Sequence, residues 1–257
     1  MSTYGFCHLS VIPVRENPSD KSQMTTQLLF GDVFEQIDSQ ANWLFIRNAY
    51  DSYTGWIDNK QQIPIDSEQF KQLKKPQYIN EHLGTLLTNQ YTNHLPPSCS
   101  FPSLTSFVIE ECNFEPKLAL VPFSEKPVSE IIPAALVYLN APYLWGGKSI
   151  YGIDCSGFTQ SVYKIAGRKL LRDAAEQETQ GETLSFLGET VPGDLAFFDN
   201  EDGKIIHVGI ILAQDKIIHA SGKVRIDTID HQGIFNEDVK KYTHKLRLLK
   251  TFKSSYP

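Results

Sequence analysis

The stretch Pro142 to Gly157, which reads PYLWGGKSIYGIDCSG, decides how the C-terminal half of this chain folds. Its glycines mark a loop that turns tightly or lets another segment approach its backbone. Directly after it, apolar residues recur at i, i+4 and i+7, the stripe of a short amphipathic helix. The residues of this stripe are Phe158, Val162 and Ile165.

The predicted helix begins at Cys155, with Asp154 as its N-cap and Gly167 as its C-terminal stop. A thiol in the first turn lies near unpaired backbone N–H groups and the positive end of the helix dipole, which favour the thiolate. The alternative is a buried structural cysteine, which is the commoner role of a single cysteine. The loop–turn–helix setting favours a nucleophile without deciding the question.

Length and composition narrow the function classes. The 257 residues suffice for one large domain or two modest ones, and 41% of them are hydrophobic. The formal charge of −6 and the lack of a Lys/Arg cluster argue against a nucleic-acid partner. No run approaches the length of a membrane span, so no membrane partner is expected.

The four cysteines form no CxxC pair, which argues against a zinc knuckle or a thioredoxin-type site. They are also too few for a disulfide scaffold of this size. The first residues, MSTYGFCHLSVIPV, lack the basic region, apolar run and cleavage site of a signal peptide. We therefore expect a cytoplasmic protein with reduced thiols.

Short strands separated by turn residues predict a small all-β barrel over residues 1–63. The predicted strands are Ser10 to Val14, Gln27 to Phe30, Val33 to Ile37, Trp43 to Arg47 and Gly55 to Ile57. Residues 64–125 show fewer clear secondary-structure patterns. A short helix is expected over Asp66 to Lys75 and a strand over Ser106 to Glu110. This segment is a connector or a degraded second unit of the same kind.

Helices followed by strands predict an α+β domain over residues 126–257. Helices are expected from Ser129 to Leu139, at Cys155 and from Asp173, where Glu176 completes a capping box, to Gly181. The strands that follow are Leu195 to Phe198, Ile205 to Leu212, Lys216 to Ala220 and Val224 to Ile229.

Two of the seven histidines, His207 and His219, lie on consecutive predicted strands inside the apolar runs IIHVGIIL and KIIHAS. A cysteine nucleophile needs a base within hydrogen-bond reach and a group that orients this base. With a three-residue loop at Ala213 to Asp215, both rings share one sheet face, whereas a two-residue loop separates them unless there is a bulge. The remaining histidines receive no role: His8, His82, His94, His231 and His244.

In order along the chain, PYLWGG, GIDCSGF, LLRDAAEQ, VPGDLAFF, HVGIIL and IIHAS resemble the NlpC-type cysteine peptidases of bacterial cell-wall metabolism. The resemblance covers about residues 128–250 and implies a papain-like fold without metal or cofactor. It assigns Cys155 as nucleophile, His207 as general base and acid, and His219 as the residue that orients the imidazole. The backbone N–H of Cys155 is a natural oxyanion donor.

The N-terminal strands resemble a bacterial SH3-type domain. The residues that carry this likeness are Val14-Arg15, Leu29 to Asp32, Trp43, Ile46-Arg47 and Tyr53 to Ile57. A leaderless chain with such a domain resembles the recycling enzymes, which act on free murein peptides with an unblocked N-terminal L-alanine.

In that subgroup, the residues that flank the cysteine and a loop tyrosine bind the peptide's α-amine, which here implies Asp154, Ser156 and Tyr143. An SH3-domain tyrosine closes the pocket, and Tyr53 is the candidate. The alternative for Asp154 is an N-cap only, and for Ser156 a first-turn helix residue.

We expect a cytoplasmic endopeptidase that cuts the γ-D-glutamyl–diamino acid bond of murein tripeptides or tetrapeptides. The rival interpretations are a hydrolase of intact peptidoglycan, an acyltransferase or amidase on the same scaffold, and a non-catalytic binding module that uses the SH3-type domain. Neither the choice between lysine and diaminopimelate nor the oligomeric state follows from the sequence.

Overall fold

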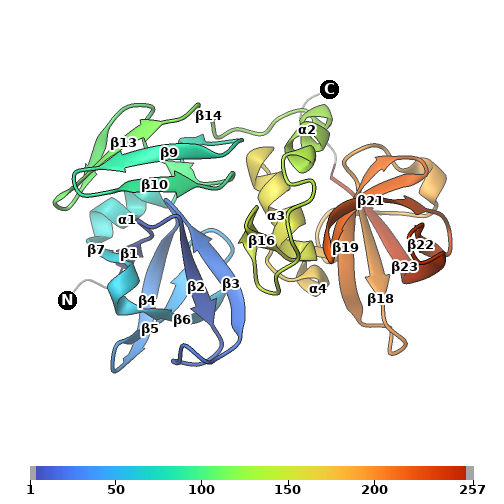
Figure 1. The fold of residues 1–257 in the computed structure, drawn as a ribbon, viewed down its shortest axis with the longest axis horizontal. Coiled ribbons are helices and arrows are strands. Elements are labelled where there is room, and N and C mark those ends of the chain that lie inside the picture. Colours follow the sequence, from blue (N-terminus) through green and yellow to red (C-terminus); the bar gives the residue numbers. More distant parts are fainter. Residues whose placement is uncertain (1–3, 253–257) are drawn as a thin grey trace. The chain divides into compact units, whose positions relative to one another are not determined.

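The computed structural model describes residues 4–252, which form two compact units (Figure 1). Unit 1 consists of residues 4–123 together with Trp145–Ile150, and unit 2 consists of Ser124–Leu144 and residues 151–252. The expected division into residues 1–63, 64–125 and 126–257 stays a prediction. Within residues 4–252, no helix combines the length and the apolar character needed to cross a bilayer.

Unit 1 begins with a seven-stranded sheet in the order β3-β2-β6-β5-β4-β1-β7. Its strands are β1 (Tyr4–Phe6), β2 (Val11–Arg15), β3 (Met24–Leu29), β4 (Val33–Gln40), β5 (Trp43–Asn48), β6 (Thr54–Asp58) and β7 (Ile63–Ile65). Every strand predicted from the sequence is present, so the β-rich N-terminal region is confirmed. The 3₁₀ turn η1 (Asn59–Gln61) and the helix α1 (Ser67–Leu73) accompany the sheet, α1 with the capping box of Asp66 and Gln69.

The rest of unit 1 folds into two small antiparallel sheets, in the orders β10-β9-β13-β12 and β11-β8-β14. Their strands are β8 (Tyr78–Ile79), β9 (Gly84–Thr88), β10 (Thr92–Leu95), β11 (Ser100–Phe101), β12 (Phe107–Ile109), β13 (Cys112–Lys117) and β14 (Val121–Pro122). The short strand β15 (Lys148–Ser149) also belongs to unit 1.

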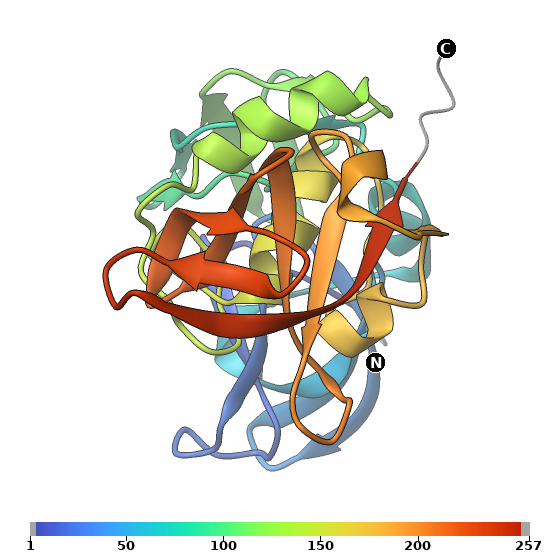
Figure 2. The same ribbon diagram turned by 90° about the vertical axis from the view of Figure 1, so that its right-hand side faces the viewer.

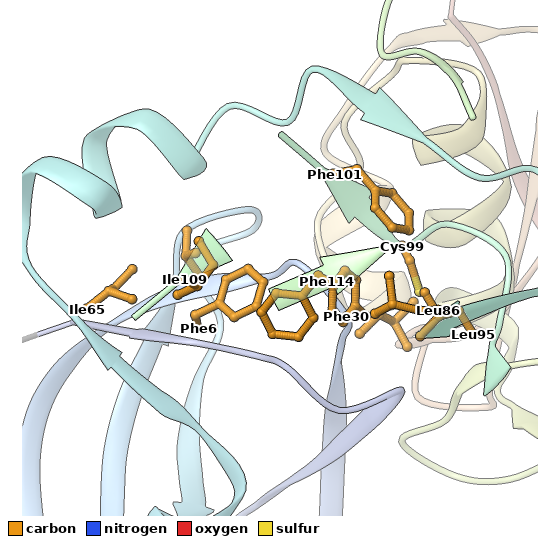
Figure 3. Close-up of a cluster of buried hydrophobic side chains, with 11 residues drawn as sticks. Phe6, Phe30, Ile65, Leu86, Leu95, Cys99, Phe101, Ile109 and Phe114 are labelled. Atoms are coloured by element: carbon orange, nitrogen blue, oxygen red, sulfur yellow. The ribbon is translucent and has the colours of Figure 1, made fainter. Parts of the chain in front are cut away.

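One aromatic-rich core joins the two parts of unit 1 (Figure 3). Phe6 lies on β1, Phe30 directly follows β3, and Phe114 comes from β13. The ring of Phe30 lies 5.6 Å from Phe6 and 5.5 Å from Phe114, centroid to centroid. Residues 64–123 therefore bury their apolar side chains against the first sheet and share its core.

Unit 2 combines short helices with a seven-stranded sheet in the order β17-β23-β18-β19-β20-β21-β22, in which β23 also pairs with β22 (Figure 2). The helical elements are η2 (Val128–Glu130), α2 (Ile131–Leu136), α3 (Cys155–Ile165), α4 (Ala174–Gln177) and η3 (Leu187–Glu189). The strands are β16 (Gly152–Ile153), β17 (Glu182–Leu184), β18 (Leu195–Asp199), β19 (Ile205–Ala213), β20 (Lys216–Ser221), β21 (Lys223–Ile229), β22 (Gly233–Asn236) and β23 (Lys241–Thr251).

Helix α3 packs against β19 and β20, and α2 packs against α3. The predicted caps of α3 are present: the Asp154 side chain accepts a hydrogen bond from the Gly157 N–H at 2.7 Å, and Gly167 has a φ of +71°. All residues of α3 are buried, so the expected amphipathic helix has no solvent-exposed face.

The other helices are shorter than the sequence predicts. The expected helix over residues 129–139 is split into η2 and α2, and Pro133 lies in the first turn of α2, where it removes no intrahelical bond. The capping box of Asp173 and Glu176 is confirmed, but α4 ends at Gln177 instead of reaching Gly181.

The β19–β20 hairpin has a two-residue loop with a bulge, which is the second of the two arrangements that the sequence analysis left open. Ala213 pairs with Lys216, and a bulge between Ile211 and Ala213 then shifts the register so that Gly209 pairs with His219. His207 lies two residues from Gly209 and therefore on the same face as His219. The bulge restores the shared face that a two-residue loop alone would abolish.

Candidate active site

The thiol of Cys155 lies at the start of α3, against strand β19. The backbone N–H groups of Val208 and Ser156 are within hydrogen-bonding reach of its sulfur. Because Val208 follows His207 in β19, this contact places the thiol beside the residue that carries the predicted base. Because Asp154 caps α3, the helix begins at Cys155, where the thiol lies against β19.

Burial and the neighbouring Asp154 carboxylate raise the pKa of Cys155 to about 12, although the N–H of Val208, the Arg172 guanidinium and the N–H of Ser156 act in the opposite direction. The helix N-terminus was expected to favour a thiolate. In this structure, the loss of hydration on burial outweighs that effect, so the resting group is a thiol.

The ring of His207 is buried and is bonded through Nε2 to Nδ1 of His219, at 2.8 Å. Burial lowers the pKa of His207 well below its usual value, and the nearby imidazoles of His219 and His244 lower it further. The imidazole is therefore neutral at pH 7. With Nε2 occupied by His219, the nitrogen left for an exchange of protons with a thiol is Nδ1.

A buried carboxylate continues this chain beyond His219. The Nε2 of His219 lies 3.0 Å from Oδ2 of Asp227, and Arg225 donates from Nη2 to Oδ1 of the same carboxylate at 2.9 Å. Burial opposes ionisation of Asp227, but the hydrogen bonds from His219 and Arg225 outweigh it and lower the pKa of this carboxyl. A charged Asp227 holds His219 in one orientation.

The sequence analysis missed Asp227 and Arg225. His219 pairs with Arg225 across the β20–β21 hairpin, so Asp227 lies two residues further along the same face. Extending the hairpin argument from β19–β20 to the run VRID would have found both residues.

The predicted amine-binding residues Asp154 and Ser156 are buried and bonded to Arg172. The guanidinium of Arg172 donates to Oδ1 and Oδ2 of Asp154 at 3.0 and 2.6 Å, and to Oγ of Ser156 at 2.9 Å. Its side chain is only 1% exposed. Asp154 is thus an N-cap and the partner of a buried arginine, a cation that the sequence analysis did not find.

The half-buried Tyr143 lies close to the same groups. Its backbone N–H donates to the Gly222 carbonyl at 3.0 Å. Burial raises the pKa of Tyr143 to about 12, and the nearby Cys155 and Asp154 act in the same direction. Tyr53, the remaining predicted site residue, is half-buried in unit 1, between β5 and β6.

His244 was given no role in the sequence analysis, and the structure corrects this. Its ring stacks on His207, with centroids 4.1 Å apart and planes 26° apart. Burial lowers the pKa of His244 to about 4, His219 adds to this effect, and Asp227 opposes it. Strand β23 lies far from β19 in the sequence, so no local pattern marks this contact.

Comparison with known proteins identifies relatives of both units. A model described as the NlpC/P60 family matches residues 140–243, and one described as the bacterial dipeptidyl-peptidase Sh3 domain matches residues 14–61. A gamma-D-glutamyl-L-lysine dipeptidyl-peptidase of Bacillus subtilis is 30% identical over 223 residues, which cover 76% of this chain and 71% of the relative.

Two further matches agree with these. Dipeptidyl-peptidase 6 of Lysinibacillus sphaericus is 28% identical over 243 residues, which cover 84% of this chain and 88% of the relative. A solved structure of an NlpC/P60 family protein from Bacillus cereus superposes with a TM-score of 0.81 at 18% identity. It covers 96% of this chain and 99% of that chain, so the two share their fold.

Proposed function

This chain belongs to the NlpC/P60 family of peptidases, and we propose that it is a papain-like cysteine endopeptidase acting on the γ-D-glutamyl–diamino acid bond of murein stem peptides. The observation that carries the proposal is the Cys155 thiol against the Val208 backbone, next to the hydrogen-bonded chain of His207, His219 and Asp227. A nucleophile beside a base that a third group orients is the arrangement that acyl transfer requires.

In the proposed acylation step, the Cys155 sulfur attacks the γ-carbonyl carbon while Nδ1 of His207 takes the thiol proton. The resting pair is neutral, so this proton moves during the attack and not before it. The oxyanion that forms accepts a hydrogen bond from the backbone N–H of Cys155 at the start of α3. Collapse of this intermediate breaks the C–N bond, and His207 returns the proton to the leaving amine.

Hydrolysis of the thioester completes the cycle. Water attacks the acyl carbon while His207 takes one of its protons, the C–S bond breaks, and His207 protonates the departing sulfur. The imidazolium that forms twice in this cycle lies in a buried site. His219, hydrogen-bonded to the charged Asp227, stabilises the imidazolium and keeps Nδ1 of His207 directed at the sulfur.

The substrate class is supported by the Bacillus subtilis relative, a gamma-D-glutamyl-L-lysine dipeptidyl-peptidase, and by the groups around the thiol. We propose that the free α-amine of an N-terminal L-alanine binds near Tyr143, Asp154 and Ser156. Because Arg172 occupies both oxygens of Asp154, the amine shares this carboxylate with a guanidinium. Fixing the amine sets the cut at a constant distance along the peptide.

We further propose that the protein is cytoplasmic and acts in murein recycling, on tripeptides or tetrapeptides released from the wall. A free L-alanine amine exists only after the peptide has been detached from its sugar. An enzyme that requires this amine therefore works on turnover products and not on the intact wall.

Mass spectrometry of the protein incubated with L-Ala-γ-D-Glu-diaminopimelate, its lysine counterpart and the N-acetylated forms tests the proposal. Cleavage of the free peptides alone, with release of L-Ala-D-Glu, is the expected result. Cleavage of free and acetylated peptides at equal rates would refute the amine site and favour action on intact peptidoglycan. Cleavage of neither form would refute the peptidase assignment.

The nucleophile is tested with Cys155→Ser and Cys155→Ala, which are expected to abolish turnover while circular dichroism stays unchanged. Cys112→Ser is the matched control, because Cys112 lies on β13 in unit 1 and has no proposed role. Turnover retained in the Cys155 variants, or lost equally in the control, contradicts the assignment.

A further inference from the structure

Three imidazoles meet in unit 2, and the proposed reaction uses only two of them. His207 and His219 come from β19 and β20, and His244 comes from β23. One ring nitrogen of each lies within 4.8 Å of the others. His244 is the most accessible of the three, being half-buried while the other two are buried.

The ring nitrogens of these histidines are the right kind of donor for a divalent transition metal. A neutral imidazole is the form of histidine that ligates metals. Nε2 of His219 is bonded to Asp227, which leaves Nδ1 as its ligand atom, and Nδ1 of His244 contacts the Thr243 hydroxyl at 2.9 Å, which leaves Nε2. A carboxylate behind a ligating histidine is the usual outer partner in zinc sites.

The spacing requires only a local adjustment. Ligand nitrogens on a tetrahedral zinc ion lie about 3.3 Å apart, because each is about 2.0 Å from the metal. The Nε2 of His207 and Nδ1 of His219 are 2.8 Å apart, so they separate by about 0.5 Å as the proton between them is displaced. The ring of His244 must also tilt out of its stack on His207, and its partial exposure leaves it room to do so.

A pocket of about 490 Å³ gives an ion a route to these rings. His244 lines it together with the carboxylates of Asp199 and Glu201 and the hydroxyl of Tyr242. Lys245 also lines this pocket, and Nε of Arg247 lies 3.7 Å from Oδ2 of Asp199, so the acidic side chains are partly balanced by cations.

We infer that His207, His219 and His244 form a binding site for a divalent transition metal of the zinc type, and that the metal inhibits the peptidase reversibly. Metal bound to Nε2 of His207 breaks its bond to His219 and prevents the ring from becoming an imidazolium. The base is then unavailable to Cys155. The inhibition rests on the proposed function, whereas the binding itself does not.

Binding is measured by titrating Zn²⁺, and separately Co²⁺ as a spectroscopic probe, into a metal-free, tag-free Cys155→Ser chain, so that the thiol contributes no ligand. One ion per chain with the absorption bands of tetrahedral Co²⁺ is the expected result. His244→Phe keeps an aromatic ring over His207 and is expected to weaken binding at least about tenfold. His231→Gln, an exposed histidine of the same unit, serves as the control with unchanged affinity.

Inhibition is measured on the wild-type chain as turnover with Zn²⁺ relative to turnover after chelation. The Zn²⁺ concentration that halves turnover is expected to rise at least about tenfold in His244→Phe and to stay the same in His231→Gln. Equal affinity in the His244 variant, or no binding at 100 µM Zn²⁺, overturns the inference even if the chain cleaves peptides. His244-dependent binding in a chain that cleaves none of the peptides supports the metal site and refutes the proposed function instead.

Discussion

Replacing Arg172 by methionine is expected to destabilise unit 2 strongly, although this residue lies outside the proposed catalytic chain. The guanidinium is buried and donates to both oxygens of Asp154 and to the Ser156 hydroxyl. Methionine has a similar length but neither charge nor donors. The substitution therefore leaves the Asp154 carboxylate buried beside the thiol with no cation to compensate it.

Breaking a buried ion pair by removing one partner costs about 3–5 kcal/mol. That is a large part of the roughly 5–15 kcal/mol that stabilises a typical domain. The Gly157 N–H still donates a hydrogen bond to the Asp154 carboxylate at 2.7 Å, so the loss of stability should not exceed about 3–5 kcal/mol. Asp154→Asn, added to Arg172→Met, removes the uncompensated charge and preserves an N-cap, so it should recover about 1–2 kcal/mol of the loss.

The assay is urea unfolding followed by far-UV circular dichroism, combined with hydrogen exchange of peptides from residues 154–177. Tryptophan fluorescence is unsuitable because Trp43, Trp56 and Trp145 all belong to unit 1. Lys240→Met is the control: it deletes the exposed pair with Glu237 in the same unit and should cost less than about 1 kcal/mol.

Two results would refute this reasoning. The first is a cost for Arg172→Met that is no larger than that of the exposed control. The second is a double variant, Arg172→Met with Asp154→Asn, that is less stable than Arg172→Met alone. Removing the Asp154 charge would then give no stabilisation, so an unpaired buried carboxylate could not be the cause of the loss.

Further predictions concern the site and the fold. Asp227→Asn removes a charge-assisted bond to His219 worth about 1.5–3 kcal/mol, so kcat should fall about 10- to 100-fold with KM little changed; an unaltered kcat refutes its positioning role. With the pKa of Cys155 near 12, its thiolate fraction at pH 7 is about 10⁻⁵, so iodoacetamide alkylation should accelerate about tenfold per pH unit from 7 to 9, and a plateau would contradict a resting thiol. Phe114→Ala should cost about 3–5 kcal/mol by tryptophan fluorescence, which reports on unit 1; a cost below 1 kcal/mol would show that the aromatic core is not shared. Gly31→Ala should also destabilise unit 1, because φ is +85° and the added Cβ would lie 1.9 Å from the Ser100 carbonyl oxygen; equal stability in the same assay would contradict this.

Local patterns were sufficient for the elements that carry the chemistry. The caps and the apolar spacing placed Cys155 at the first residue of α3, and the alternation in β19 and β20 placed two histidines on neighbouring strands. These signals are readable because capping and strand alternation act over a few residues. The order of the motifs added the family, which the relatives confirm.

Tertiary structure decided how these groups are coupled. The bulge that keeps His207 and His219 on one face depends on strand pairing, and the stack of His244 on His207 depends on how β18 pairs with β23 on one side and with β19 on the other. Residue spacing does not encode the bulge, because it depends on the pairing register, and it does not encode the stack, because β23 and β19 are far apart in the sequence.

The ionisation states also depended on the fold. The helix dipole predicted a thiolate at Cys155, but burial and the Asp154 charge favour the thiol, and Arg172 reaches Asp154 from another segment of the chain. A sequence identifies which groups can titrate and which caps they form. Their pKa values follow from hydration and neighbouring charge, and these exist only once the chain has folded.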